Sequence, residues 1–391
     1  MTDYSPAFSR NDQSPIAKWF WTIDRGLLAA ALTLVALGVS LSFASSPAAI
    51  LADQSITDPF HYSWRMIVWA SGGITLMLLA SLLSPRGVRR IALLGLLAAI
   101  VVVSALPFIG NEVKGAARWV NLGPFSLQPS EFAKPSLIVF AAWMFSEAQK
   151  GQGVPGVSIA FAAWAVTVFL LLIQPDIGQT LLITTTFMAV FFMAGVPLRW
   201  VAVLGGLFVA GTTAIYLLFP HVQSRVAKFV SPGVEDTHQI DRASEAIAAG
   251  GLVGRGVGEG VMKRSVPDLH TDFIYSVGAE EFGLVLSLIV IGLYAFIVIR
   301  GMRRAMMLND PFEQTAAAGL FMLIGLQASI NVAVNLNLIP TKGMTLPFIS
   351  YGGSSMLSMG LTMGLALALT RRRPGAYEPG ASLPQGRRIL P

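Results

Sequence analysis

Ten long apolar runs constrain the fold of this chain more than any other feature of its sequence. A helix that crosses the hydrocarbon core of a bilayer needs about 20 mostly apolar residues. We predict an all-α integral membrane protein of about ten transmembrane helices, which cover residues 26–45, 64–83, 91–109, 132–148, 156–173, 178–195, 199–219, 273–299, 316–338 and 346–370. The fourth and sixth of these runs are short enough to form re-entrant segments instead of spanning helices.

The composition supports a membrane protein and excludes several other classes. Hydrophobic residues make up 54% of the chain and charged residues only 12%, whereas soluble domains carry about 25% charged residues. The net charge of +6 comes largely from arginines between the apolar runs, so nucleic-acid binding is the weaker interpretation. Cysteine is absent from the sequence, which rules out disulfides, thiolate metal sites and a cysteine nucleophile.

The basic residues predict the orientation of the bundle, because cytoplasmic loops retain Lys and Arg. Alternate connections divide into a set with 16 basic residues and a set with five in short connections, plus six in one long loop. The first set is predicted to be cytoplasmic and includes both ends of the chain. We therefore expect a cytoplasmic segment at 1–25, a membrane domain at 26–370 with an outer loop at 220–271 between the seventh and eighth helices, and a disordered cytoplasmic tail at 371–391.

Two predicted outer connections near the middle of the chain combine cations, an aromatic residue and carboxylates. Lys114, Arg118 and Trp119 precede Glu131 and Lys134, which lie one helical turn apart and are expected to pair. A helix start with an interfacial Trp and a rim salt bridge would explain them equally well. In the next outer connection, Gln174 to Gly178, we expect Asp176 to cap the following helix.

The end of the long loop carries further polar groups. Lys263, His270, Thr271 and Asp272 come before the eighth run, and Glu280 lies inside its start. Alternating glycines from 254 to 260 resemble a dinucleotide-binding motif, but no strand precedes them. Asp272 and Glu280 are eight residues apart and would share a helix face. The alternative is that Asp272 only caps the helix that opens at Phe273.

The last outer connection places Lys342 before a stretch rich in Gly and Ser that includes Ser354. Small residues there would also allow close packing of helices, which is the structural explanation for the stretch.

Several blocks, taken together and in this order, resemble the SEDS family (shape, elongation, division and sporulation). The resemblance covers most of the chain, and residues 340–348 are similar to the division branch. Pro267-Asp268, where Pro-Glu is more usual, and His238 before Gln239, where Tyr is common, depart from the pattern. The blocks are Arg118-Trp119, Gln128 to Glu131, Gln174 to Gly178, His270 to Ile274 and Pro347 to Ser355.

The resemblance implies a peptidoglycan glycosyltransferase that polymerises lipid II at the outer face of the bacterial inner membrane, at the division septum. It also implies partners: a class B penicillin-binding protein (FtsI-like) that supplies the transpeptidase, and division-complex membrane proteins similar to FtsQ, FtsL and FtsB. A lipid II flippase, an elongation-type polymerase and a non-catalytic division scaffold remain alternatives. A flippase would need charges at mid-membrane depth, whereas most charges here lie near the predicted outer rim.

The resemblance also assigns roles to residues. Asp272 matches the essential aspartate of the family and is expected to act as the general base or as a ligand of a divalent cation, Mg or Mn. Trp119 is a candidate for stacking on the substrate, and Glu131 for positioning Lys134. The expected substrate-binding residues are Lys114, Arg118, Trp119, Glu131, Lys134, Lys263, His270, Thr271, Glu280, Lys342 and Ser354.

Overall fold

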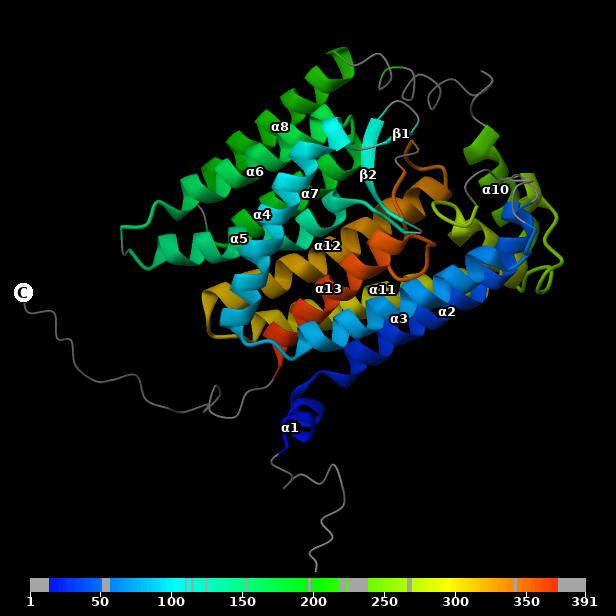
Figure 1. The fold of residues 1–391 in the computed structure, drawn as a ribbon, viewed down its shortest axis with the longest axis horizontal. Helices are drawn as coiled ribbons and strands as arrows, with labels where there is room; N and C mark the ends of the chain where they lie inside the picture. Colours follow the sequence, from blue (N-terminus) through cyan, green and yellow to red (C-terminus); the bar gives the residue numbers. More distant parts are fainter. Residues whose placement is uncertain are drawn as a thin grey trace, which may run out of the picture.

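The computed structural model describes a bundle of long helices that lie side by side (Figure 1). It describes residues 14–50, 57–109, 111–113, 116–123, 125–151, 153–195, 198–218, 223, 238–265, 269–340 and 343–371. The helices are α1 (Pro15–Thr22), α2 (Arg25–Ile50), α3 (His61–Ser81), α4 (Pro85–Ile109), α5 (Pro129–Gln149), α6 (Gly156–Ile173), α7 (Ile177–Met193), α8 (Leu198–Leu218), α10 (His238–Gly250), the 3₁₀ helix η1 (Met262–Ser265), α11 (Ile274–Met306), α12 (Pro311–Asn335) and α13 (Gly353–Thr370).

Every predicted apolar run coincides with a helix, and the prediction of a multi-pass helical membrane protein is confirmed. Among the described residues, seven helices are long and apolar enough to cross a membrane: α2, α3, α4, α6, α11, α12 and α13. The helices α5, α7 and α8 occupy the other three predicted runs, so ten spans stay a prediction. The start of the last run was wrong, because residues 346–352 form turns and α13 begins at Gly353.

A small antiparallel sheet between α4 and α5 was not predicted. It consists of β1 (Asn111–Val113), β2 (Ala116–Leu122) and β3 (Phe125–Leu127), in the order β1-β2-β3. Gly123 adopts a φ of 66° at the turn between β2 and β3, a conformation that glycine adopts without strain. Two of these strands have only three residues, too few to reveal an alternating pattern in the sequence.

The centre of the bundle is α13, which is almost entirely buried and packs against α3 (Figure 1). Small residues make this close approach possible. A Cβ at Gly360 would lie 2.3 Å from the carbonyl oxygen of Gly73, and a Cβ at Gly364 would lie 2.5 Å from that of Met77. Helices in lipid associate through such close contacts. Within the stretch for which a packing role was predicted, a Cβ at Gly353 would lie 2.3 Å from the Trp69 ring of α3, so that role is confirmed there.

A break in α11 at Gly283 is bridged by the end of the long loop. Gly283 has a φ of 71° inside an otherwise helical segment. Backbone groups on both sides of the break bond outside the helix, as a low-dielectric environment requires. The four hydrogen bonds run from Arg255 N to Glu280 O (3.0 Å), Gly256 N to Glu281 O (3.0 Å), Leu284 N to Gly251 O (3.0 Å) and Val285 N to Leu252 O (3.3 Å).

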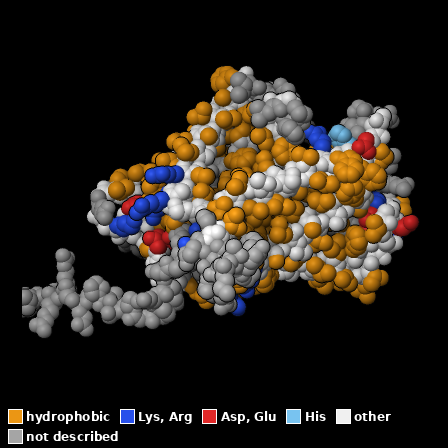
Figure 2. Space-filling view, turned by 60° about the horizontal axis from the view of Figure 1, so that its bottom comes forward, with side chains coloured by type: hydrophobic (Ala, Val, Ile, Leu, Met, Phe, Trp, Pro, Cys, Tyr) orange, Lys and Arg blue, Asp and Glu red, His pale blue; other side chains and the backbone are white. Residues whose placement is uncertain are grey.

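The two ends of the described chain lie at the same end of the bundle. A cavity of about 150 Å³ is lined by residues 21–26 from the start of the chain, by Arg300 and Arg304 at the end of α11, and by Thr370. This arrangement agrees with the predicted sidedness. The opposite end, where α11 begins, is called the outer end below. Exposed hydrophobic side chains cover much of the visible surface between charged groups at the two ends (Figure 2).

Candidate active site at the outer end

Asp272 lies in the turn that leads into α11 at the outer end, and its side chain is partly buried. A Cβ on Gly343 would lie 3.8 Å from Asp272 Oδ2, so this carboxylate faces the start of the segment before α13. The alternative placed Asp272 at the N-cap of this helix, whereas Phe273 occupies the N-cap position and makes no side-chain cap hydrogen bond.

Three buried amide side chains lie in a row on α12, and two of them hold the backbone of Asp272. Gln327, Asn331 and Asn335 follow one another at four-residue spacing and so line one face of the helix. Asn331 Nδ2 and Asn335 Nδ2 donate to the carbonyl oxygen of Asp272 at 2.9 and 3.0 Å. We call these three residues the amide ladder. The amide ladder was not predicted from the sequence, although polar residues at helical spacing inside an apolar run are a usable signal.

The amide ladder also joins α11 to the segment before α13. Asn335 Oδ1 accepts hydrogen bonds from Ser276 Oγ at 2.7 Å and from Ser276 N at 3.3 Å, near the start of α11. Asn331 Nδ2 donates to the carbonyl oxygen of Met344 at 2.7 Å. The turn that carries Asp272 is therefore held from two sides by fixed donors and acceptors, which limits the movement of its backbone.

Glu131 and Lys134 form a buried ion pair on α5, at the other end of the amide ladder. Lys134 Nζ lies 2.9 Å from each carboxylate oxygen of Glu131 and donates to Gln327 Oε1 at 2.8 Å. Gln179 Nε2 on α7 donates to Glu131 Oε1 at 2.6 Å. The predicted pairing is confirmed, and the pair lies in the core, because Lys134 is 0% and Glu131 3% exposed.

Arg118 and Asp176 organise the turn between α6 and α7. Arg118 donates from Nε to the carbonyl oxygen of Gln174 and from Nη2 to that of Pro175, both at 2.9 Å. The predicted cap is confirmed, since an oxygen of Asp176 accepts from Gln179 N at 3.2 Å. Burial raises the pKa of Asp176 above its ordinary value, although the positive charge of Arg118 opposes the shift.

Neighbouring predicted residues lie around the same turn. Trp119 is partly buried in β2, opposite Asn111 of β1. Ser354, at the start of α13, accepts a hydrogen bond from Gln128 N at 2.8 Å. The side chain of Gln128 in turn donates to Asp176 Oδ2 at 3.3 Å. The structure thus joins the sheet, α5, α7 and α13 at one place, whereas the predicted contacts of Trp119 and Ser354 with substrate stay predictions.

Glu280 and Lys263 hold the end of the long loop against α11. The Glu280 carboxylate accepts hydrogen bonds from the backbone N–H groups of Val261, Met262 and Lys263 at 2.7 to 2.8 Å. Lys263 Nζ pairs with Glu281 and donates to the carbonyl oxygen of Ala44 at 3.0 Å. The prediction that Asp272 and Glu280 share a helix face was wrong, because Asp272 precedes α11 and the Glu280 carboxylate is hydrogen-bonded to the loop.

His270 and Thr271 lie directly before Asp272. The ring of His270 stacks on that of Tyr62, with centroids 4.3 Å apart, and its carbonyl oxygen accepts from Tyr351 N at 3.0 Å. Thr271 is partly buried in the same turn. Lys114 and Lys342 lie outside the described residues. Among the residues that the structure describes, no group of three or more His, Cys, Asp or Glu side chains is arranged to hold a metal ion.

These features define the class: a multi-pass helical membrane protein with a fixed polar site at one end of its bundle. The family model of cell cycle proteins that covers FtsW, RodA and SpoVE matches residues 25–374. The chain belongs to this family, which is the SEDS family that its sequence blocks resemble.

Known proteins support the assignment along nearly the whole chain. The chain is 62% identical over 381 residues to the probable peptidoglycan glycosyltransferase FtsW of Caulobacter vibrioides, a match that covers 97% of each chain. It is 35% identical over 373 residues to the protein of the same name from Coxiella burnetii, covering 92% of this chain and 97% of that one.

Two solved structures share the fold. A chain of a peptidoglycan synthase complex, studied for how it coordinates polymerization and crosslinking, matches with a TM-score of 0.73 and 28% identity, over 89% of this chain and 97% of that one. The rod shape determining protein RodA of Thermus thermophilus matches with a TM-score of 0.63 and 28% identity, over 89% of this chain and 96% of that one.

Proposed function

We infer that this chain is a peptidoglycan glycosyltransferase of cell division, and we propose that it polymerises lipid II into glycan strands at the outer face of the inner membrane. Relatives that cover nearly the whole chain carry the name of this activity. The observation that supports a site on the outer end is the clamp on Asp272, whose backbone is held by Asn331 and Asn335. Preorganisation of this kind is what a catalytic group needs.

The reaction requires a base and a way to stabilise the leaving group. A sugar hydroxyl of the acceptor attacks the anomeric carbon of the donor and loses its proton. The bond from that carbon to the phosphate oxygen breaks, and undecaprenyl pyrophosphate leaves with the bonding electrons. In our proposal Asp272 accepts the proton, and positive groups stabilise the charge on the pyrophosphate.

The contacts separate the candidate cations into two groups. Lys134 and Lys263 are buried and ion-paired, and Arg118 is bonded to backbone carbonyls, so we assign these three to positioning in the described conformation. Lys342 directly precedes Gly343 in the sequence, and a Cβ on Gly343 would lie 3.8 Å from Asp272 Oδ2. We therefore propose Lys342 as a pyrophosphate ligand. Lys114 is a second candidate.

A divalent cation fits this site only if the substrate supplies part of its ligands. Mg²⁺ is commonly held by one or two carboxylates together with substrate phosphates and water. As the alternative to its role as the base, we propose that Asp272 would hold Mg or Mn, with the remaining ligands supplied by the substrate and water. When bound, the cation would neutralise charge on the leaving group.

The proposed partners follow from the chemistry of the product. A glycan strand becomes a wall only after crosslinking, so we propose a class B penicillin-binding protein as the transpeptidase partner. The division role further suggests a location at the septum and contacts with other division-complex membrane proteins.

Polymerisation of labelled lipid II by the purified chain and its transpeptidase partner, with Mg²⁺ or Mn²⁺, tests the proposal. We expect glycan strands from the native chain and from Asp58→Asn, which changes an exposed aspartate, and no strands from Asp272→Asn or Asp272→Ala. Strands formed equally by the Asp272 variants would refute the catalytic assignment. Transport of lipid II across vesicles without polymer would favour a flippase, and neither activity would favour a scaffold.

A further inference from the structure

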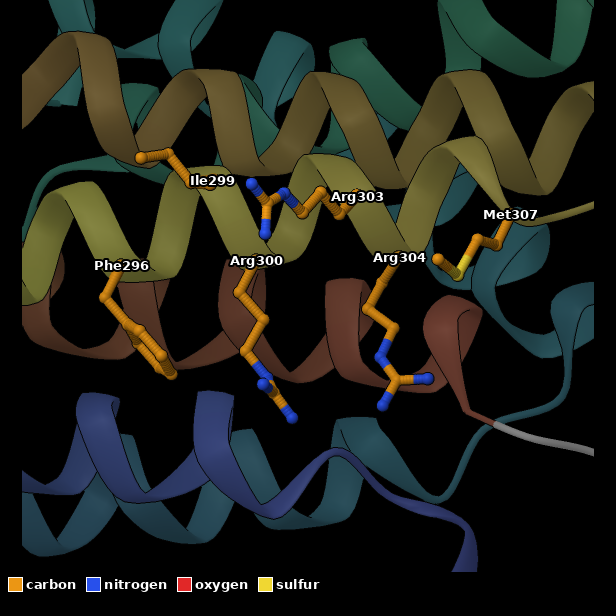
Figure 3. Close-up of a pocket in the computed structure, with 6 residues that line it drawn as sticks. All are labelled: Phe296, Ile299, Arg300, Arg303, Arg304 and Met307. Atoms are coloured by element: carbon orange, nitrogen blue, oxygen red, sulfur yellow. The ribbon is translucent and has the colours of Figure 1, made fainter.

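A cavity of about 450 Å³ lies on the surface of α11 at the end opposite the candidate active site. Five of its six lining residues come from the last three turns of α11, and the sixth, Met307, is the C-cap of that helix. They form two neighbouring rows at four-residue spacing, as Figure 3 shows: Phe296, Arg300 and Arg304 in one row, and Ile299, Arg303 and Met307 in the other.

The cavity spans a change from apolar to cationic surface. Nearer the outer end, α11 exposes the large apolar side chains Leu288, Ile289 and Ile291. This is the surface expected of a helix in contact with acyl chains. Phe296 and Ile299 continue that surface, at 41% and 53% exposed. The three arginines follow at once. A molecule that fills the cavity therefore meets apolar groups at one end and guanidinium groups at the other.

Two of the arginines are held in place by Asp24. Arg300 and Arg304 donate through their Nε atoms to Asp24 Oδ1 and Oδ2 at 2.9 and 2.8 Å. The carboxylate also accepts from the backbone N–H groups of Gly26 and Leu27 at 3.0 and 3.1 Å. Fixed donors lose less conformational entropy when they bind a ligand than mobile surface side chains do.

The local charge favours an anion. Three arginines line the cavity, and only two of them, Arg300 and Arg304, pair with a carboxylate, that of Asp24, whose side chain is only 2% exposed. In Figure 3, Arg300 and Arg304 project toward α2, and Arg303 projects from the neighbouring row. Among the described residues, Arg303 has no hydrogen bond or ion pair to a protein group. Guanidinium groups recognise phosphate through paired N–H donors.

A second cavity adjoins the same arginines on the side of α1. Its volume is about 150 Å³, and Arg300 and Arg304 line it together with residues 21–26. The guanidinium of Arg25 lies 4.4 Å from the ring centroid of Phe20 and 4.5 Å from that of Trp21. Aromatic side chains of this kind are enriched at the interface between acyl chains and head groups.

We propose that this cavity binds an anionic phospholipid of the cytoplasmic leaflet. The phosphate lies among Arg300, Arg303 and Arg304, and an acyl chain runs along Phe296 and Ile299. Basic pockets at this depth on the cytoplasmic side are suited to acidic lipid head groups. Because the cavity has apolar side chains at one end and arginines at the other, it favours a lipid, which has both an acyl chain and a phosphate, over a soluble phosphate ester.

Native mass spectrometry of the full chain in detergent, titrated with phosphatidylglycerol or phosphatidylethanolamine, tests the proposal. We expect tighter binding of phosphatidylglycerol. Arg303→Gln should weaken it about fivefold, the effect of about one basic residue at an anionic surface. Arg90→Gln, an exposed arginine of α4 at the same end, should leave it unchanged. Ile299→Asp, which adds a negative charge beside the arginines, should weaken it further.

Three outcomes would overturn the proposal. The first is equal binding of the two lipids by the native chain. The second is unchanged phosphatidylglycerol binding in both Arg303→Gln and Ile299→Asp, with thermal unfolding like that of the native chain. The third is competition by glycerophosphoglycerol as strong as that of the intact lipid, which would indicate a site for soluble phosphate esters.

Discussion

At the scale of single residues, the free-energy cost of removing a charge from water determines which partners the buried charged side chains have. An ion removed from water is tolerated only with a partner and further hydrogen bonds. Lys134 meets that condition through Glu131 and Gln327. Asp24 meets it through two arginines and two backbone amides. For both arrangements, substitutions that remove the charge but keep a side chain of similar size show how much the charge contributes to stability.

Substituting one partner of the core ion pair should destabilise the protein more than substituting both. Lys134→Met or Glu131→Gln leaves an uncompensated buried charge, which costs about 3 kcal/mol or more of unfolding free energy. The double variant should recover a large part of that loss. Thermal unfolding in detergent of the four proteins measures the coupling.

The matched control for this pair lies near the surface. Lys150 pairs with Glu147 at 2.9 Å, with the lysine side chain 40% exposed. Lys150→Met should change the unfolding free energy by less than about 1 kcal/mol. Additive effects of the two core substitutions would show that Glu131 and Lys134 are not coupled.

Asp24 should make stability depend on pH in the acid range. Burial alone raises the pKa of Asp24, but hydrogen bonds and the charges of Arg300 and Arg304 lower it below its ordinary value. The unfolded chain then binds this proton more tightly. The stabilisation is therefore present above the unfolded pKa of about 3.9 and is lost as the pH falls through the lower folded value.

The melting temperature, followed from neutral pH to below about pH 4, checks this expectation. The native protein should lose stability more steeply than Asp24→Asn in that acid range, because the variant has no carboxyl group to protonate. Parallel curves for the two proteins would contradict the assigned role of the carboxylate.

At the scale of elements, the break in α11 depends on a glycine and on the loop that bridges it. A Cβ at Gly283 would lie 2.4 Å from Gly254 N and 2.5 Å from Leu252 O. Gly283→Ala therefore meets both a strained φ and a clash with the bridging segment. We expect a loss of about 2 kcal/mol or more and faster hydrogen exchange in residues 250–265.

Gly292→Ala is the control within the same helix. No atom lies within 4 Å of a Cβ added there, and its helical backbone favours alanine by about 0.5 to 1 kcal/mol. The control should be as stable as the native chain or more so. Similar exchange of residues 250–265 in both variants would mean that the break does not depend on this glycine.

The amide ladder of α12 should act on the rate of polymerisation and not on substrate affinity. Asn331→Leu removes the donor to the carbonyl oxygens of Asp272 and Met344. A displacement of about 1 Å at a catalytic group can cost about 100-fold in rate. We expect kcat to fall at least about tenfold with little change in KM.

Ser329→Leu, an exposed position on α12, provides the matched control and should keep the native kcat. A rise in KM without a fall in kcat for Asn331→Leu would place that residue in substrate binding instead. Equal kcat for the native chain and Asn331→Leu would remove the ladder from the mechanism.

At the scale of the whole molecule, the sequence predicted what depends on the bilayer and missed what depends on contacts between elements. Each of the ten predicted apolar runs coincides with a helix, because a helix that crosses the hydrocarbon core needs about 20 mostly apolar residues. Local rules also found the Glu131–Lys134 pair and the cap at Asp176. The break at Gly283 was invisible, because a single glycine in an apolar run does not reveal the loop that fills the gap.

The candidate site was predictable in part for the same reason. Family resemblance singled out Asp272, but only the folded chain places the amides of α12 beside its backbone. Likewise, the spacing of Asp272 and Glu280 suggested a shared face, whereas the loop of η1 engages Glu280. Long-range partners of polar groups depend on packing, which periodicity along one element does not encode.

The sidedness of the bundle gives a prediction that the natural sequence makes easy to check. The chain has no cysteine, so each introduced cysteine is a unique label. Val253, next to the break in α11, is 80% exposed, and Val154, between α5 and α6, is 40% exposed. The positive-inside rule places Val154 in the cytoplasm with Lys150 and Val253 outside.

A membrane-impermeant maleimide applied to spheroplasts should therefore label Val253→Cys at once and Val154→Cys only after lysis. The cysteine-free native chain controls for background labelling. The reverse labelling pattern would show that the predicted orientation is inverted. Asp272 would then lie on the cytoplasmic side and the arginines of α11 in the outer leaflet, which would contradict both polymerisation at the outer face and lipid binding in the cytoplasmic leaflet.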